Sequence, residues 1–274
     1  MTTRYTILGA SGFIGSHLVS HLQAAGYECH SPLRGDRTLF TTPLGHVIYC
    51  VGLTADFRSR PLETVEAHVC LLRRLLAHGN FASLTYLSST RVYAGASVTR
   101  ESATLSVNPN DFGDLYNLSK LMGESLCLHG GRTNARVVRL SNIVGLRSDP
   151  DIFIDQLLEE GRRTGRVVLR TALSSRKDYL YIEDAVAALT QIAGSAAQGI
   201  INVASGEGVE NREIVRFLEA QMGFSVEVMP NAPVWDFTTV DTSRLNTEFS
   251  ISPRPFAEYF PEFLQHYCRN KGLS

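Results

Sequence analysis

The chain has 274 residues, of which 44% are hydrophobic, and its formal net charge at pH 7 is -1. A chain of this length and composition can bury a sizeable core, as one large domain or as two unequal ones. The near-neutral charge implies no general attraction to nucleic acid or to an anionic membrane. No basic-aromatic pattern supports nucleic-acid binding either.

Cysteine and histidine usage points to a reducing compartment and away from metal chemistry. The five cysteines lack CxxC spacing, and the eight histidines show no HExxH or Cys/His ligand pattern. No apolar run is long enough to span a bilayer, and the first residues lead into a strand rather than a signal peptide. We therefore expect a cytoplasmic protein with no metal site and no membrane segment.

A strand, a glycine turn and a helix open the chain. Residues 5–8 (YTIL) suit a buried strand, residues 9–15 (GASGFIG) form the turn, and apolar residues then recur at helical spacing. Gly9 permits the tight turn, Gly12 lets the backbone approach a pyrophosphate, and Gly15 lets the helix pack on the strand. The spacing is GxxGxxG rather than GxGxxG, so a plain strand-to-helix turn is the alternative. The cofactor-binding residues predicted here are Gly9, Ser11, Gly12, Phe13, Ile14 and Gly15.

The end of the second strand bears on the choice of cofactor. Residues 27–31 read as that strand, and Leu33 stands at the usual acidic position, with Arg34 next. A guanidinium suits the 2′-phosphate of NADP, whereas an acidic residue would accept the ribose 2′-hydroxyl of NAD. Asp36 is the acidic alternative if the strand ends later. We predict NADP(H), with NAD(H) as the alternative.

A further apolar strand over residues 46–51 ends at Val51 and Gly52, where the chain can pass close to the cofactor. Pro61 then begins a helix, with Arg73 and Arg74 on its solvated side. The helical period predicts a buried apolar stripe, made of Leu62, Val65, Val69, Leu72 and Leu76.

The next strand and helix carry the candidate catalytic groups. Residues 84–87 form a strand that delivers Ser89 at its carboxyl end, where ligands bind in open α/β sheets. Tyr116 and Lys120 are four apart and share one helix face. A phenol has an unperturbed pKa of about 10, which a neighbouring ammonium and a positively charged nicotinamide would lower. With the Ser89 hydroxyl, they would form a proton relay for a carbonyl or carbinol.

Strands and helices alternate through the rest of the chain and become mixed with loops after residue 145. We expect strands over 136–140, 167–169, 200–203 and 225–229, and helices over 152–160, 183–192, 211–222 and 256–267. Asp149-Pro150-Asp151 is expected to form a turn before the first of these helices. The pattern predicts an α/β fold, a doubly wound parallel sheet with a smaller C-terminal α+β lobe.

The order of these motifs resembles the extended short-chain dehydrogenase/reductase family, the NAD-dependent epimerase/dehydratase group. The similar stretches span nearly the whole chain and are residues 9–15, 87–93 (LSSTRVY), 116–120 (YNLSK), 139–145 (RLSNIVG), 176–184 (RKDYLYIED) and 201–206 (INVASG).

The resemblance implies a Rossmann-like NAD(P) domain over 1–145, to which 176–204 returns, and a substrate lobe over 146–175 and 205–274. It implies a nucleotide-sugar substrate and a homodimer. Carried over by position, Tyr116 is the acid/base and Ser89 its hydroxyl partner. Lys120 lowers the pKa of Tyr116 and holds the nicotinamide ribose. Substrate contacts are implied at Thr90, Arg91, Asn142 and Arg176.

Departures from the family pattern narrow the chemistry. Related dehydratases carry Asp-Glu where Thr90-Arg91 stands, and decarboxylases carry Glu at Arg91. What remains is redox chemistry at one carbon, by a 4-ketoreductase or a 4-epimerase. Arg91 either reaches the substrate or forms a loop salt bridge, and His68 stands where asparagine is common. A non-catalytic NADP sensor and a reductase of a non-sugar ketone are the alternative functions.

Overall fold

A six-stranded parallel sheet forms the centre of the molecule. The structure, a computed structural model, describes residues 3–54, 56–147 and 152–272. All five strand pairings of this sheet are parallel, which confirms the predicted sheet. In spatial order the strands are β10 (Gly199–Val203), β5 (Ala135–Leu140), β4 (Ser83–Ser89), β3 (His46–Tyr49), β1 (Arg4–Leu8) and β2 (Glu28–His30).

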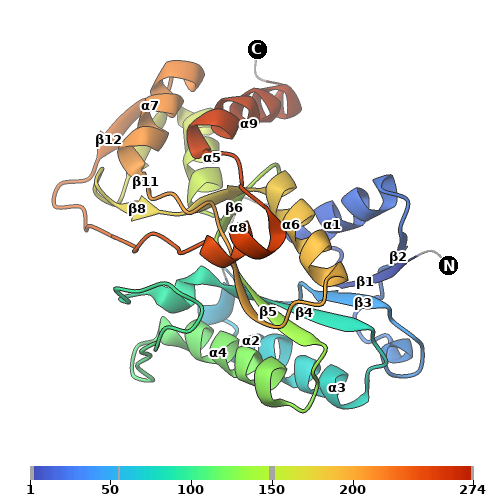
Figure 1. The fold of residues 1–274 in the computed structure, drawn as a ribbon. Helices are drawn as coiled ribbons and strands as arrows, with labels where there is room; N and C mark the ends of the chain where they lie inside the picture. The colour runs from blue at the N-terminus through green and yellow to red at the C-terminus, as the bar shows by residue number, and fades with distance from the viewer. Residues whose placement is uncertain (1–2, 55, 148–151, 273–274) are drawn as a thin grey trace.

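Helices cover both faces of the sheet, as Figure 1 shows. On one face lie α1 (Phe13–Ala24) and α6 (Ile182–Gly194); on the other lie α2 (Pro61–Val65), α3 (Leu71–His78) and α4 (Asp114–His129). Strand β3 illustrates the alternation, because its Ile48 packs in the same apolar core as the α1 helix, whereas Val47 and Tyr49 pack in the core of the α3 helix. The sheet is therefore buried on both sides, as a parallel sheet requires.

The connection between β2 and β3 is short. Residues 31–45 contain only the 3-10 turn η1 (Arg37–Phe40) between these two strands. The sheet consequently ends at β2, one strand earlier than the 3-2-1-4-5-6 order of the fully doubled dinucleotide-binding fold. The chain reverses its strand order between β1 and β3, and the loop 31–45 lies next to that switch point in place of a helix and a strand.

The predicted stripe of the helix beginning at Pro61 is partly wrong. A π-helical segment, Glu66–Cys70, separates α2 from α3. Thr64, His68 and Leu72, each four residues apart, are buried along this stretch, whereas Leu62 is 82% exposed. A residue inserted into the helical hydrogen-bond ladder shifts every side chain on one side of it, which apolar spacing alone does not reveal.

The smaller C-terminal lobe contains short strands and helices (Figure 1). Aromatic side chains from residues 256–267 are buried in the apolar core. Three two-stranded pairings hold the lobe together, β6 with β9, β12 with β7, and β11 with β8. Most predicted elements are present, α8 was not predicted, and the 149–151 turn lies outside the described residues. The bounds are β6 (Asn142–Val144), α5 (Phe153–Thr164), β7 (Arg166–Leu169), β8 (Arg176–Lys177), β9 (Tyr179–Tyr181), β11 (Val209–Glu210), α7 (Asn211–Met222), β12 (Ser225–Val228), α8 (Ser243–Phe249) and α9 (Phe256–Lys271).

Candidate active site

The glycine turn between β1 and α1 is closely packed against backbone. Gly9 has a φ of +82°, a conformation that favours glycine. A Cβ on Gly15 would clash with the Gly9 carbonyl oxygen and lie 2.8 Å from the Gly9 carbonyl carbon. Gly9 and Gly15 thus have the conformation and the packing that the sequence assigned to them.

The N-terminus of α1 is open to an anionic ligand. No side chain caps the helix, its first turn has no acidic residue, and Ser11 and Gly12 are exposed ahead of it. Uncapped N–H groups and the positive end of the helix dipole suit phosphate groups. Phe13 and Ile14, in the first turn, are half-buried. The residues of this turn therefore fit a dinucleotide pyrophosphate.

The adenosine end of the predicted cofactor site carries basic rather than acidic groups. Strand β2 ends at His30, and Arg34 is exposed in the loop that follows. Asp36 caps the η1 turn, where its carboxylate accepts hydrogen bonds from the Thr38 backbone N–H (2.8 Å) and hydroxyl (2.7 Å). Asp36 thus has a local structural role that the strand pattern alone did not indicate.

Ser89 and Tyr116 meet at the carboxyl end of β4. The Ser89 Oγ accepts a hydrogen bond from the Arg91 N–H (3.2 Å) and lies close enough to the Tyr116 phenol to influence its pKa. Burial raises the pKa of Tyr116, whereas the Ser89 hydroxyl and the positive charge of Arg91 act to lower it. Because side chains alternate along a strand, the preceding Ser88 points the other way, to Glu124 (2.5 Å).

Lys120 lies one helical turn after Tyr116 and is buried. Its Nζ is 5.8 Å from the centroid of the Tyr116 ring and donates a hydrogen bond to the Leu87 carbonyl (2.8 Å). Burial lowers the pKa of Lys120 to about 7, against the opposing effects of Glu124 and Cys50. With one protein acceptor, the ammonium keeps donors for a ligand hydroxyl.

His68 packs against Tyr116, lies close to Lys120 and is neutral. Its ring stands edge-on to the Tyr116 ring, with centroids 5.4 Å apart. Its Nδ1 lies 2.8 Å from the Ser119 hydroxyl, which itself donates to a carbonyl, and its Nε2 accepts from the Leu53 N–H (3.3 Å). These contacts fix the Nδ1–H tautomer. Burial and the charge of Lys120 lower the pKa of His68 to about 2.

Gly52 contributes to the same wall. A Cβ on Gly52 would lie 2.9 Å from His68 Nε2 and 3.5 Å from Lys120 Nζ. Val51 before it is half-buried. The structure therefore brings the predicted residues at the end of β3 to the Tyr116–Lys120 pair.

Arg91 lies on the Tyr116 ring, not in a loop salt bridge. Its guanidinium carbon is 5.4 Å from the Tyr116 ring centroid, and its Nη2 donates to the Gly113 carbonyl (3.2 Å). No carboxylate of the described residues lies within ion-pair distance of it. Thr90 beside it is half-buried at the same strand end.

The two other predicted substrate residues lie on two-stranded pairings outside the six-stranded sheet. Asn142 is exposed on β6 and donates to the Asp178 carbonyl (2.8 Å). Arg176 on β8 pairs with Glu210 on β11 (3.3 Å). Within the described ranges, no hydrogen bond or ion pair joins either side chain to Ser89, Tyr116 or Lys120.

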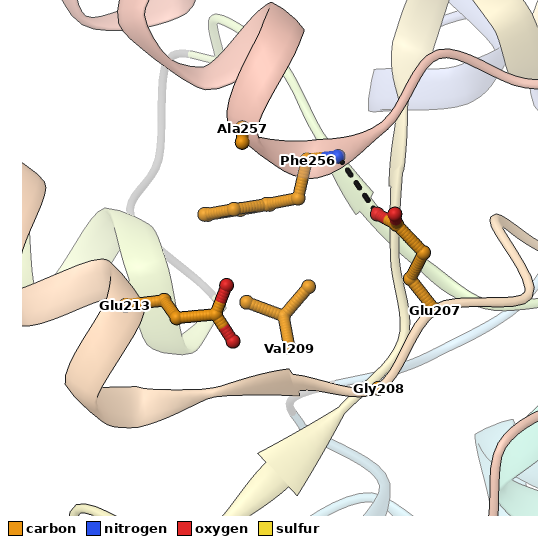
Figure 2. A pocket seen from close by; sticks show the side chains of 6 residues that line it. All are labelled: Glu207, Gly208, Val209, Glu213, Phe256 and Ala257. Carbon is orange, nitrogen blue, oxygen red and sulfur yellow. Dashed lines mark hydrogen bonds between the residues drawn. The ribbon is translucent and has the colours of Figure 1, made fainter.

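A pocket of the C-terminal lobe, shown in Figure 2, is separate from these groups. Glu207, Gly208, Val209, Glu213, Phe256 and Ala257 line its volume of about 250 Å³. Its carboxylates have structural partners, because Glu207 accepts from the Phe256 N–H (2.9 Å) and Glu213 accepts from the Glu210 N–H (3.1 Å). Both carboxylates therefore stabilise helix N-termini.

Residues 5–204 match the model of the NAD dependent epimerase/dehydratase family. The chain therefore belongs to this family and is an enzyme of the extended short-chain dehydrogenase/reductase type. It is 29% identical, over 80% of each chain, to a GDP-6-deoxy-D-mannose reductase of Pseudomonas aeruginosa. It is 23% identical to a dTDP-4-dehydro-6-deoxy-D-allose reductase of a Streptomyces species, over 97% of this chain and 96% of that one.

Solved structures share the fold. MoeE5 in complex with UDP-glucuronic acid and NAD has a TM-score of 0.82 and 21% identity, covering 98% of this chain and 99% of that one. RMD from Pseudomonas aeruginosa with NADPH has a TM-score of 0.72 and 24% identity, covering 92% and 94%. In the part of the chain that the structure describes, no helix is long and apolar enough to cross a bilayer.

Proposed function

We propose that the protein is an NAD(P)-dependent oxidoreductase acting at one carbon of a nucleotide-activated sugar, as a 4-ketoreductase or a 4-epimerase. The observation that carries this proposal is the placement of the Ser89 hydroxyl beside the Tyr116 phenol at the carboxyl end of β4, with Lys120 one turn further along α4. The two curated relatives are both named reductases, which favours the ketoreductase.

In the proposed mechanism, three side chains handle the proton. Tyr116 donates its phenolic proton to the carbonyl oxygen during reduction, or accepts one from the carbinol during oxidation. The Ser89 hydroxyl hydrogen-bonds the same oxygen, and the Lys120 ammonium stabilises the phenolate. A bound nicotinamide supplies or accepts the hydride. Burial of Tyr116 keeps bulk water away from the proton transfer.

The residues at the end of β4 argue against dehydration and decarboxylation, the reactions of related enzymes that carry acidic residues there. Thr90 and Arg91 offer neither a carboxylate to remove a proton from carbon nor an acid to assist the departure of water. We therefore propose hydride exchange without elimination. A pure NADP sensor would need no Ser89–Tyr116 pair, and the Arg176 and Asn142 segments favour a nucleotide sugar over a simple ketone.

We propose NADP(H) as the cofactor. Arg34 and His30 are the charged or titratable groups at the end of β2, and Asp36 already caps η1. A 2′-phosphate would gain a guanidinium partner there. RMD from Pseudomonas aeruginosa, a protein of similar structure, was solved in complex with NADPH.

We further propose that the protein works in the cytosol as a homodimer. All five cysteines are free, which suits a reducing compartment. Leu62 on α2 and Met122 on α4 are 82% and 54% exposed, and these helices contact each other. A second copy packed on this face would cover both side chains.

We also propose that residues 146–175 and 205–274 form the lobe that covers the substrate.

Replacing Tyr116 by Phe tests the function. We expect kcat to fall about 10²- to 10⁴-fold on the nucleotide sugar that the enzyme accepts, with NADPH affinity retained, because the ring stays and the proton donor is lost. Tyr27→Phe, a half-exposed tyrosine outside the site, is the matched control. Wild-type turnover by Tyr116→Phe would refute the mechanism. Tight NADPH binding with no turnover on UDP-, GDP- and dTDP-linked sugars would favour the sensor.

A further inference from the structure

Two cationic side chains gather beside Tyr116. The guanidinium carbons of Arg58 and Arg91 lie 4.5 Å and 5.1 Å from the centroid of the same Phe57 ring. A Cβ on Gly113 would lie 3.3 Å from Arg91 Nη2 and 3.7 Å from Arg58 Nη2, so both guanidiniums face one point, from which Asp111 Oδ1 is 3.1 Å away. We call Arg58 and Arg91 the cationic cluster.

Burial and the charge of Arg58 lower the pKa of Arg91, which shows that the two cations of the cluster repel each other. Arg91 is half-buried, and Arg58 is exposed. A further cation, Lys177, lies over the rings of Phe153 (5.1 Å) and Trp235 (5.6 Å), and burial and the charge of Arg91 lower its pKa.

Among the described residues, no carboxylate forms an ion pair within 4.0 Å of a nitrogen of Arg58 or Arg91. Asp111 and Asp114 lie near Arg91 and act to raise its pKa. Each also accepts a backbone hydrogen bond, Asp111 from the Gly113 N–H (2.7 Å) and Asp114 from the Asn108 N–H (2.7 Å). An anion supplied by a ligand would therefore find guanidinium donors here with no ion pair to displace.

We propose that Arg91 and Arg58 form a subsite for a carboxylate on the sugar ring of the substrate. This inference rests on the proposed function, and it narrows the substrate class to nucleotide-linked sugar acids. Guanidinium groups bind carboxylates through paired charge-assisted hydrogen bonds, and Arg91 has unused N–H donors beyond the one that holds Gly113.

The position of the cluster favours a sugar carboxylate over the diphosphate linkage. Tyr116 acts on the reacting carbon, which belongs to the sugar, and Arg91 lies on the ring of that tyrosine. An anion at the cluster is therefore within reach of the reacting end of the substrate.

The test compares acidic and neutral sugars on the same nucleotide. Dissociation constants of the full chain with NADP⁺ are measured by calorimetry for UDP-glucuronate and UDP-glucose, and for GDP-mannuronate and GDP-mannose. The variants are Arg91→Gln, Arg91→Lys and Arg58→Gln, with Arg73→Gln on the exposed side of α3 as the matched control. Thermal melting verifies that each variant folds. If Arg91→Gln does not fold, Arg58→Gln, a change to an exposed side chain, tests the subsite in its place.

We expect the uronate to bind at least tenfold more tightly than its neutral partner. Arg91→Gln should weaken uronate binding about 10- to 100-fold, as loss of a charge-assisted hydrogen bond implies, and neutral-sugar binding less than threefold. Arg91→Lys should lose less, and Arg73→Gln should behave as wild type.

Three results would overturn the subsite while leaving the proposed function intact. The first is equal binding of acidic and neutral sugars by the wild type. The second is an equal loss of affinity for both sugars in Arg91→Gln, which indicates a diphosphate contact. The third is a fall in kcat with dissociation constants unchanged, which indicates an effect on the Tyr116 phenol alone. Binding of NADP⁺ without binding of any nucleotide sugar would overturn the subsite and the proposed function together.

Discussion

Gly15→Ala is the substitution whose effect follows most directly from the geometry of the glycine turn. The added Cβ would clash with the Gly9 carbonyl oxygen and lie 2.9 Å from the Ala10 Cα. These are backbone atoms, which cannot rotate away, so the turn and the start of α1 must separate. Overpacking of this kind costs about 1–3 kcal/mol, here towards the upper end.

The net loss in the free energy of unfolding is smaller, because alanine is a better helix former than glycine. Replacing glycine within a helix returns about 1 kcal/mol, which leaves a net loss of about 2 kcal/mol. For a chain of this size, that loss lowers the Tm by about 4–8 °C. Displacement of the N–H groups at the start of α1 should also weaken NADPH binding by about tenfold or more, since each lost contact with a charged group costs about 1.5–3 kcal/mol.

Urea unfolding and titration of NADPH fluorescence measure the two effects separately. Ser20→Ala, on the exposed side of the same helix, is the control and should change stability by less than about 0.5 kcal/mol. An unchanged unfolding midpoint together with a wild-type dissociation constant for NADPH in Gly15→Ala would refute both the packing argument and the placement of the pyrophosphate.

Three further predictions concern other parts of the chain. His68 has a pKa of about 2 when folded, so below pH 6.5 the unfolded chain takes up a proton that the folded chain refuses. The free energy of unfolding should therefore fall by about 2 kcal/mol from pH 6.5 to pH 5. In His68→Asn, urea unfolding should no longer show this dependence on pH, and the same pH dependence in the variant and the wild type would contradict the role of His68. Arg34→Gln should raise the dissociation constant for NADPH about tenfold and leave that for NADH within twofold; equal changes would speak against a 2′-phosphate contact. Leu62→Glu combined with Met122→Glu should shift sedimentation from dimer to monomer, and a dimer that persists would place the interface elsewhere.

Much of the sheet and of the site could be predicted because its signals are local. Buried strands read as apolar runs, the glycine turn is contiguous, and Tyr116 and Lys120 lie on one helix face by spacing alone. The rule that ligands bind at the carboxyl ends of parallel strands then places Ser89 near Tyr116, where the structure has it. Their catalytic roles stay predictions.

The features that the sequence did not reveal depend on tertiary structure. The π-helical segment changes which side of the helix is buried, and no residue type marks it. The position of His68 drew attention, but its tautomer follows from Ser119 and Leu53, which are distant in the chain. Arg58 meets Arg91 only through folding, because it lies in a polar loop that is distant from Arg91 in the sequence.

Transfer of a labelled hydride tests the central claim most directly. The full chain is incubated with NADPH carrying deuterium at the C4 position of the nicotinamide, on either face, and with a panel of nucleotide-linked 4-keto sugars that includes sugar acids. We predict that one ring carbon of the product gains deuterium with the wild type, and that the gain is lost in Tyr116→Phe. NADPH binding without deuterium in any product would contradict the assignment of this chain as a nucleotide-sugar oxidoreductase.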